Sequence, residues 1–302
     1  MATAAEPQPA SLPLPGGRGG ATVRLTPLLT ATFPKPPGWM HRADGGGSVR
    51  KAFGFGVQQS EMLRLPVPAF LLEHPGAGHV LVDTGYHASV AVDPKQNLGR
   101  VGAFLSKGIE MDPSQAVAAQ LRERGIEPES VSVVVMTHLH WDHASAISEF
   151  PRATFLVCEE EWEAATDRQP WRHGYAPRQF DHGFDYRLVD FESAAAESFS
   201  SFGRAFDVLG DGSVHIVATP GHTLGHMSVV VKTSGPEILL AGDAIYTERT
   251  LREGALPYLM EDPHRFKRSL REIQLYVEQS PDALIVPGHD LDFWNRLERV
   301  YE

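Results

Sequence analysis

The residues of this chain that are best suited to chemistry lie in one short segment, residues 137–143, with the sequence THLHWDH. Three imidazoles and a carboxylate fall within six positions there, at His138, His140, Asp142 and His143. Imidazole nitrogens and carboxylate oxygens suit borderline-soft divalent metals, with zinc as the first expectation. The segment follows an apolar, β-branched run at residues 131–136, which predicts a buried strand. We therefore predict a metal-binding loop at a strand end.

The later part of the chain repeats this design three times. An apolar run ends in a turn that carries His222, Asp243 or His289, and a glycine precedes each of them. Seven ligand-type residues are too many for one tetrahedral ion but suit two. We expect His138, His140 and His222 at one ion, Asp142, His143 and His289 at the other, and Asp243 as the bridge. Two cations about 3.5–4 Å apart can share a hydroxide, which is a strong nucleophile near neutral pH.

This ligand set resembles that of the metallo-β-lactamase superfamily, and the resemblance extends over residues 22–302. It implies an α/β fold (α+β in some schemes), an αββα sandwich of two mixed β-sheets flanked by helices. It also places Asp83, in the sequence Asp-Thr-Gly, at a strand-end position that orients the ligand loop. Redox members of the superfamily carry glutamate at the position of His140. Histidine there favours hydrolysis with two zinc ions, although manganese or iron would also suit the site.

The position of Tyr246, three residues after Asp243, resembles the N-acyl homoserine lactone lactonases. In that branch the tyrosine hydroxyl contacts the substrate carbonyl. The resemblance implies a hydrolase that opens the lactone ring of N-acyl homoserine lactones, an activity called quorum quenching. It also implies catalytic roles for Tyr246 and Asp142. Asp142 would carry a proton to the leaving alkoxide, in competition with its role as a ligand. We expect His226 to support the first ion, and the remaining histidines to lie at the surface or in hydrogen bonds.

Other members of the superfamily are the alternatives. A glyoxalase II-like thioesterase would carry a C-terminal helical region, whereas thirteen positions follow His289 (302 − 289). Another esterase or phosphoesterase of this fold shares the metal core and stays open. A nuclease is disfavoured by the acidic charge, and an exported β-lactamase by the lack of a signal-peptide pattern. A scaffold protein with lapsed catalysis would be expected to lack some of the ligands.

Composition bears on which partners the protein can bind and on its location in the cell. The net charge of -11 argues against nucleic acid as a partner, because phosphate binding needs a basic surface. No window approaches the roughly 18 apolar residues of a membrane span, so we expect no membrane insertion and a cytoplasmic location. Cys158 is the single cysteine and is expected to be a small buried hydrophobe.

Periodicity and turn residues predict the supporting elements. We expect a flexible arm over residues 1–21, disordered or loosely docked and rich in Pro, Gly and Ala, and a single domain over 22–302. Residues 159–205 are expected to form a cap-like insertion over the site, and the aromatic loop 33–56 to line the pocket or a homodimer interface. Strands are predicted at 63–72, 79–83, 131–136, 153–158, 215–218, 227–232, 238–240 and 283–286. Helices are predicted at 113–124, from 144–150 and at 263–279.

Overall fold

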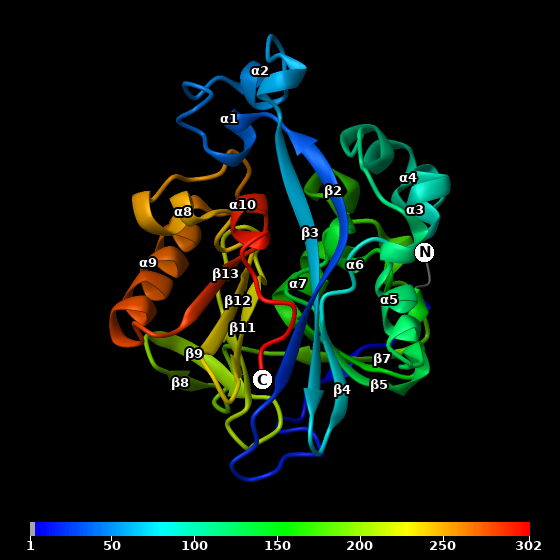
Figure 1. Cartoon of the computed structure of the whole chain (residues 1–302), viewed down its shortest axis with the longest axis vertical. Coiled ribbons are helices and arrows are strands. Elements are labelled where there is room, and N and C mark those ends of the chain that lie inside the picture. Colours follow the sequence, from blue (N-terminus) through cyan, green and yellow to red (C-terminus); the bar gives the residue numbers. More distant parts are fainter. Residues whose placement is uncertain (1–3) are drawn as a thin grey trace.

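Two mixed β-sheets form the centre of the computed structural model, which describes residues 4–302 (Figure 1). The first sheet has seven strands in the order β1 (Gln8–Pro9), β7 (Asp185–Val189), β6 (Thr154–Cys158), β5 (Val131–Val135), β4 (Gly78–Val82), β3 (Leu63–His74) and β2 (Arg24–Lys35). The second has six, in the order β13 (Leu284–Pro287), β12 (Glu237–Gly242), β11 (Met227–Lys232), β10 (Val214–Ala218), β9 (Phe202–Asp207) and β8 (Glu197–Phe199).

The main core lies between the two sheets. Because side chains alternate across a strand, Val133 and Val135 of β5 face this core, whereas Val134 faces the outer helices. Val229 and Val231 of β11 meet them from the second sheet. The β-branched runs identified in the sequence are therefore strands that are buried on both faces, as in other sheets covered by helices.

Helices cover the outer face of each sheet (Figure 1). The α-helices are α1 (Pro37–Met40), α2 (Val49–Ala52), α3 (Ser89–Val92), α4 (Pro94–Leu105), α5 (Val117–Glu123), α6 (Trp141–Ala144), α7 (Glu159–Thr166), α8 (Glu248–Glu253), α9 (Pro263–Gln279) and α10 (Leu291–Trp294). Leu121 of α5 and Ala165 of α7 pack on the first sheet, and Leu270 and Ile273 of α9 on the second. The predicted αββα sandwich is confirmed.

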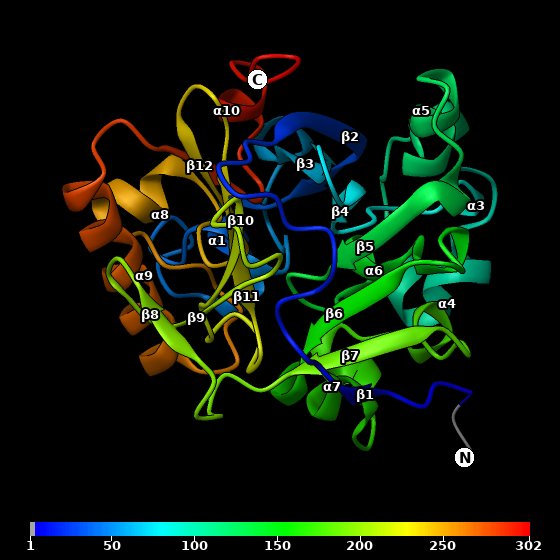
Figure 2. The same ribbon diagram turned by 90° about the horizontal axis from the view of Figure 1, so that it is seen from below.

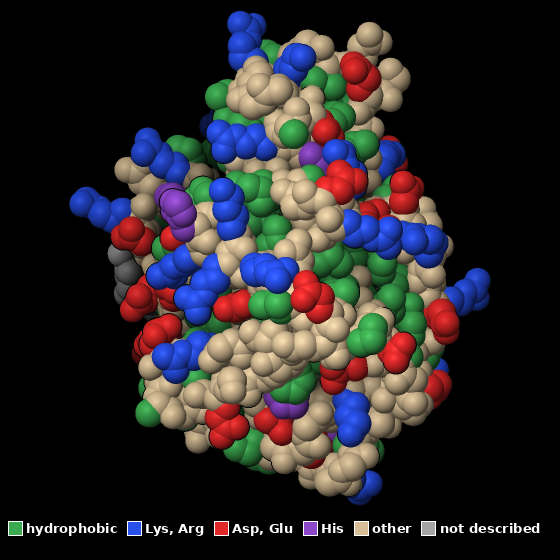
Figure 3. All heavy atoms as spheres, turned by 90° about the vertical axis from the view of Figure 1, so that its left-hand side faces the viewer, with side chains coloured by type: hydrophobic (Ala, Val, Ile, Leu, Met, Phe, Trp, Pro, Cys, Tyr) green, Lys and Arg blue, Asp and Glu red, His purple; other side chains and the backbone are tan. Residues whose placement is uncertain are grey.

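The helix α9 shows how the sequence specifies one of these elements. Asp262 accepts hydrogen bonds from the backbone N–H groups of His264 and Arg265, and Pro263 occupies the first helical position, as the sequence predicted. The outward face of this side of the molecule carries acidic and basic side chains intermingled (Figure 3). With 17 residues and this charged face, α9 does not qualify as a membrane span, nor does any other helix within residues 4–302.

The strand ends explain why distant residues can meet. The strands β4 and β5 run parallel in the first sheet, and β12 and β13 run parallel in the second. The strand β10 is antiparallel to β11, which is antiparallel to β12, so β10 points the same way as β12. The turns after these strands therefore gather at one edge of the sandwich, and rigid strand ends can hold ligands there.

The described part of residues 1–21 is docked on the sandwich instead of being disordered. Gln8–Pro9 pairs in parallel with β7, and the Leu14 backbone N–H donates to the Val208 carbonyl at 2.7 Å. Leu12 and Leu14 pack against the core between the sheets, and the segment runs across the open end of the sandwich (Figure 2). The Pro-rich composition predicted little burial, but these two leucines cover apolar surface of the core. Residues 1–3 lie outside the described residues.

The expected cap over residues 159–205 was too broad. The strand β7 is a full member of the first sheet, paired with β6 from Thr154 to Cys158, and β8 and β9 extend the second sheet. Trp162 of α7 and Phe180 pack in the core between the first sheet and its outer helices instead of over the site. The longest irregular stretch between these elements is 167–184, and part of it reaches the cavity described below. The helix expected from 144–150 begins earlier, as the short α6 at Trp141.

Candidate metal centre and active site

Asp83 organises the loop that follows β5. It stands directly after β4 with a φ of 58°, a left-handed conformation that aspartate tolerates better than most residues. Its carboxylate accepts hydrogen bonds from the Thr137 backbone N–H and hydroxyl, both at 2.8 Å. It also accepts from His143 Nδ1 at 2.7 Å, which turns Nε2 of that ring toward the other histidines. Asp83 therefore sets both the start of the loop and the orientation of one candidate ligand.

Replacing Asp83 by asparagine should weaken metal binding without removing a ligand. Asparagine keeps the shape and tolerates the positive φ, but its NH₂ group would face a donor of Thr137 or His143. We expect metal affinity to fall about 10–100-fold and the free energy of unfolding of the metal-free protein to fall by about 1–3 kcal/mol. Competition with a zinc-binding dye and urea unfolding in chelator measure the two effects.

The chain offers a matched control in a second buried Asp–His pair. The Asp211 carboxylate lies 3.0 Å from His74 Nε2 and also accepts the Ser213 backbone N–H. Asp211→Asn should lower stability to a similar extent and leave metal affinity unchanged. Equal metal affinities in the two variants would contradict an orienting role for Asp83.

The seven predicted ligands come together at this edge, in three overlapping groups. In each group, one donor atom from every member lies within 4.8 Å of the others. The groups are His138, His140 and His222; His138, His143 and Asp243; and Asp142, His143 and His289. The first and third groups are the two sites that the sequence predicted.

Asp243 lies between these two sites. Its Oδ2 is 3.2 Å from His222 Nε2, and its Oδ1 is 3.2 Å from His289 Nε2. Burial would raise the pKa of Asp243, but the charges of His289 and His222 outweigh burial and hold this pKa well below its ordinary value. Each carboxylate oxygen thus faces one site, which is the geometry expected of a bridging ligand.

The donor atoms of this cluster fit divalent cations. Within residues 4–302, buried His138 Nε2, His143 Nε2 and Asp243 Oδ1 have no hydrogen-bond partner. An unpaired buried polar atom costs roughly 1–3 kcal/mol, so several together call for a compensating group. Burial lowers the pKa of His140 to about 4 and that of His138 well below its ordinary value, which keeps both rings neutral and able to bind metal. That these residues bind the ions stays a prediction.

Each of the three glycines before the ligands has a physical reason. Two of them have a positive φ, and at the third a side chain would collide with a neighbouring turn. Gly221 and Gly242 have φ values of 134° and 53°. Gly288 does not, but a Cβ atom there would lie 2.8 Å from Asp243 Oδ1. The third glycine therefore allows two turns to approach each other closely.

His226 supports the cluster from behind. Its Nε2 accepts the backbone N–H of Asp243 at 3.0 Å, and its Nδ1 pairs with the Thr219 hydroxyl at 2.9 Å. Burial lowers the pKa of His226 to about 3, so the ring stays neutral and can act as this acceptor. The sequence predicted a supporting role at the first site, and the structure places the contact on the backbone of Asp243 instead.

Glu161 is a supporting residue that the sequence analysis missed. Its fully buried carboxyl group accepts the Leu139 backbone N–H at 2.8 Å, in the middle of the ligand loop. A Cβ atom on Gly225 would lie 2.1 Å from the Glu161 backbone nitrogen, so the loop that carries His222 packs directly on the start of α7. Burial raises the pKa of Glu161 to about 7. Three successive glutamates at 159–161 gave no signal for which one turns inward.

A cavity of about 540 Å³ opens beside the cluster. Its floor carries His140, Asp142, His222, Asp243, Tyr246 and His289. Its walls are mainly apolar and come from well-separated parts of the chain, with Phe33, Trp39, Leu65, Leu105, Trp141, Trp171, Leu224, Leu259 and Met260. Trp141 of the ligand loop thus forms part of a wall. The sequence left open whether the loop 33–56 lines the pocket or an interface, and its aromatic residues fall into two groups. Phe33 and Trp39 line the cavity, whereas Phe53 and Phe55 are 45% and 64% exposed.

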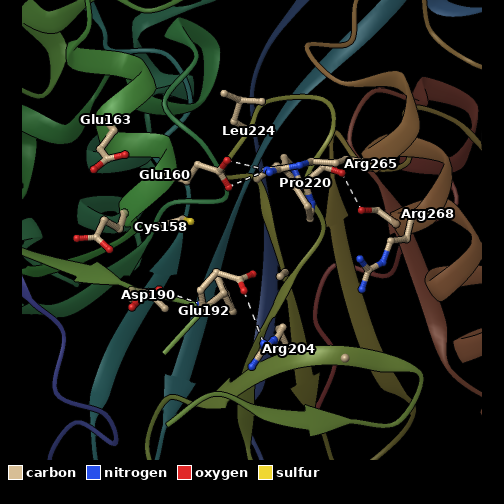
Figure 4. A pocket seen from close by; sticks show the side chains of 18 of the residues that line it. Cys158, Glu160, Glu163, Asp190, Glu192, Arg204, Pro220, Leu224, Arg265 and Arg268 are labelled. Atoms are coloured by element: carbon tan, nitrogen blue, oxygen red, sulfur yellow. Dashed lines mark hydrogen bonds and ion pairs between the residues drawn. The ribbon is translucent and has the colours of Figure 1, made fainter. Parts of the chain in front are cut away.

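A second hollow of about 520 Å³ lies between α7 and α9, away from the predicted ligands (Figure 4). Its basic groups face carboxylates: Arg265 Nη1 lies 2.7 Å from Glu160, and Arg204 Nη2 lies 3.6 Å from Glu192. Cys158 also lines it, and burial raises the pKa of this thiol to about 12, so it is inert as a nucleophile at neutral pH. The predicted chemistry therefore belongs to the first cavity.

Comparison with known proteins agrees with this geometry. The sequence pattern of the Metallo-beta-lactamase superfamily matches residues 62–289. The chain belongs to this superfamily. It is 34% identical over 241 residues to the N-acyl homoserine lactonase AttM of Agrobacterium fabrum, covering 79% of this chain and 87% of that protein. It is 36% identical over 240 residues to AttM of Azorhizobium caulinodans, covering 78% and 86%.

Solved structures extend the comparison to the fold. A mutant of AiiA from B. thuringiensis, with N-decanoyl-L-homoserine bound at its active site, superposes with a TM-score of 0.73 at 24% identity, covering 92% of this chain and 97% of that one. The predicted membership is confirmed, and with it the resemblance to the lactonase branch. This metallo-β-lactamase fold protein is a metal-dependent hydrolase.

Proposed function

We propose that this hydrolase opens the lactone ring of N-acyl homoserine lactones and that it does so with two zinc ions. The observation that carries the proposal is the position of Tyr246, whose hydroxyl lies at the cavity floor 3.1 Å from His222 Nδ1. The identity to relatives named N-acyl homoserine lactonase supports the choice of substrate. An apolar cavity with a few convergent polar groups suits a small amphipathic molecule of this kind.

The residues that would hold the two ions are the seven described above, with Asp243 between them. When bound, two divalent cations supply Lewis-acid polarisation of a carbonyl and a nucleophile at neutral pH. Tyr246 would donate its phenolic hydrogen to the ring carbonyl oxygen as negative charge develops there. Burial raises the pKa of Tyr246 well above its ordinary value, so the phenol keeps that hydrogen.

Asp142 would move the proton that ring opening requires. Its Oδ2 is 3.8 Å from His289 Nε2 and 4.0 Å from His143 Nε2, and its side chain is 12% exposed to the cavity. It would accept a proton from the attacking group and return it to the ring oxygen that leaves as an alkoxide. The acyl chain would lie along the walls formed by Phe33, Trp39 and Trp171.

A substrate panel tests the proposal. The zinc-loaded protein should hydrolyse N-acyl homoserine lactones with a higher kcat/KM than a glutathione thioester or a phosphodiester. Turnover can be followed by the proton released on ring opening. Clear thioester hydrolysis without lactone hydrolysis would replace the proposal by the glyoxalase II-like alternative, and phosphodiester hydrolysis alone would favour a phosphoesterase.

A further inference from the structure

A lysine ends the strand that forms one wall of the cavity. Lys35 is the last residue of β2, and its ammonium group lies 4.4 Å from the centre of the Trp39 ring and 5.5 Å from that of Phe33. Both rings line the same cavity as Lys35. An ammonium over aromatic faces is stabilised by the ring quadrupoles. The arrangement directs a cation into a space whose walls are otherwise largely apolar.

The hydrogen-bonding capacity of this ammonium is only partly used. It has three N–H donors, and one of them bonds to the Leu105 carbonyl at 3.0 Å. Within residues 4–302 no carboxylate forms an ion pair with Lys35, whereas His173 on another wall is paired with Glu261 at 3.0 Å. Burial lowers the pKa of Lys35 to about 8, partly offset by the charge of Asp142, so the group is still mainly cationic at neutral pH.

A purely structural role would explain one of these contacts. Leu105 ends α4, and a lysine at the last carbonyl of a helix satisfies an orphan acceptor and interacts favourably with the helix dipole. Such a role can be performed from solvent. It does not require the ammonium to lie over Trp39 and Phe33 in a cavity that also contains Tyr246 and Asp142. The remaining donors therefore call for an acceptor inside the cavity.

We propose that Lys35 is a specificity-determining residue that donates a hydrogen bond to a carbonyl oxygen on the acyl arm of the substrate. The inference rests on the proposed lactonase function. The ring carbonyl belongs at the floor, where Tyr246 and the candidate ligands converge, so the acceptor for Lys35 lies farther along the molecule. Every acyl homoserine lactone has an amide carbonyl there, and 3-oxo-acyl substrates have a second carbonyl two carbons beyond it.

Two variants and three lactones test the inference. The lactones are an alkyl γ-lactone without an acyl group, N-octanoyl homoserine lactone and its 3-oxo form. Lys35→Met should lower kcat/KM at least about tenfold for an acylated lactone, the effect of losing a hydrogen bond from a charged group. It should leave the alkyl lactone within about twofold of wild type. Lys107→Met, at an exposed lysine just beyond α4, should change none of the three values.

The pattern of losses identifies the acceptor. A loss on both acylated lactones indicates the amide carbonyl, and a loss confined to the 3-oxo form indicates the second carbonyl. An equal change on all three lactones, or no change, would overturn the inference and leave Lys35 as a helix cap. Zinc content and the urea midpoint of Lys35→Met establish that the variant is loaded and folded, and Lys35→Arg, which retains N–H donors, should recover part of the acyl preference.

The failure of the underlying function would look different. Wild-type protein that hydrolyses none of the three lactones would overturn the lactonase proposal, and the inference with it. Wild-type protein that hydrolyses the acylated lactones, together with a Lys35→Met variant that has unchanged acyl preference, would overturn the inference alone.

Discussion

The Asp243→Asn variant should lose both metal loading and turnover. Oδ1 and Oδ2 of Asp243 face His289 and His222 at 3.2 Å each, so this one carboxylate serves both candidate sites. An asparagine amide would present NH₂ to one site and would remove the negative charge between two cations. We expect kcat/KM to fall at least about a thousandfold, more than for the loss of one oxyanion donor, because both ions lose a ligand.

Elemental analysis and lactone turnover measure the two losses separately. Asp185→Asn is a suitable control, since Asp185 lies on β7 with a side chain that is 43% exposed and pairs only with Arg187 and Thr154 among residues 4–302. That variant should bind two ions and react at the wild-type rate. If Asp243→Asn also retained two zinc ions and full activity, the bridging assignment would be wrong.

The position of the cluster was predictable because each ligand is specified locally. His138, Asp243 and His289 follow short apolar runs that predict buried strands, and parallel strands end at one edge of a sheet. A glycine beside a ligand marks a tight turn, as at Gly221 and Gly242. Residue type, spacing and turn chemistry thus identify the candidate ligands, and the arrangement of the strands brings them together.

The residues that escaped prediction depend on contacts that are distant in sequence. Lys35 resembles any lysine at a strand end until the structure brings the Leu105 carbonyl beside it. Leu12 and Leu14 are isolated apolar residues in a Pro-rich segment, and only the open end of the sandwich gives them a surface to cover. Tertiary packing decides such cases, and neither periodicity nor composition reports it.

The Tyr246→Phe variant should separate catalysis from metal binding. With Nε2 of His222 bound to a metal ion, Nδ1 would carry the hydrogen and donate it to the Tyr246 oxygen, which lies 3.1 Å away. The phenolic hydrogen is then free to bond to the ring carbonyl of the substrate. Loss of one well-placed donor costs roughly 2.7–4 kcal/mol, so kcat/KM should fall about 10²–10³-fold.

A matched variant and the zinc content decide whether this tyrosine acts on substrate or only holds His222. Tyr186 is also fully buried, and its hydroxyl has no partner among residues 4–302, so Tyr186→Phe should leave kcat/KM unchanged. If Tyr246 acts on substrate, Tyr246→Phe keeps two zinc ions and loses rate. If it only orients His222, the variant loses zinc, and its rate per fully loaded protein stays at the wild-type value. That second outcome would contradict the proposed role of the phenol.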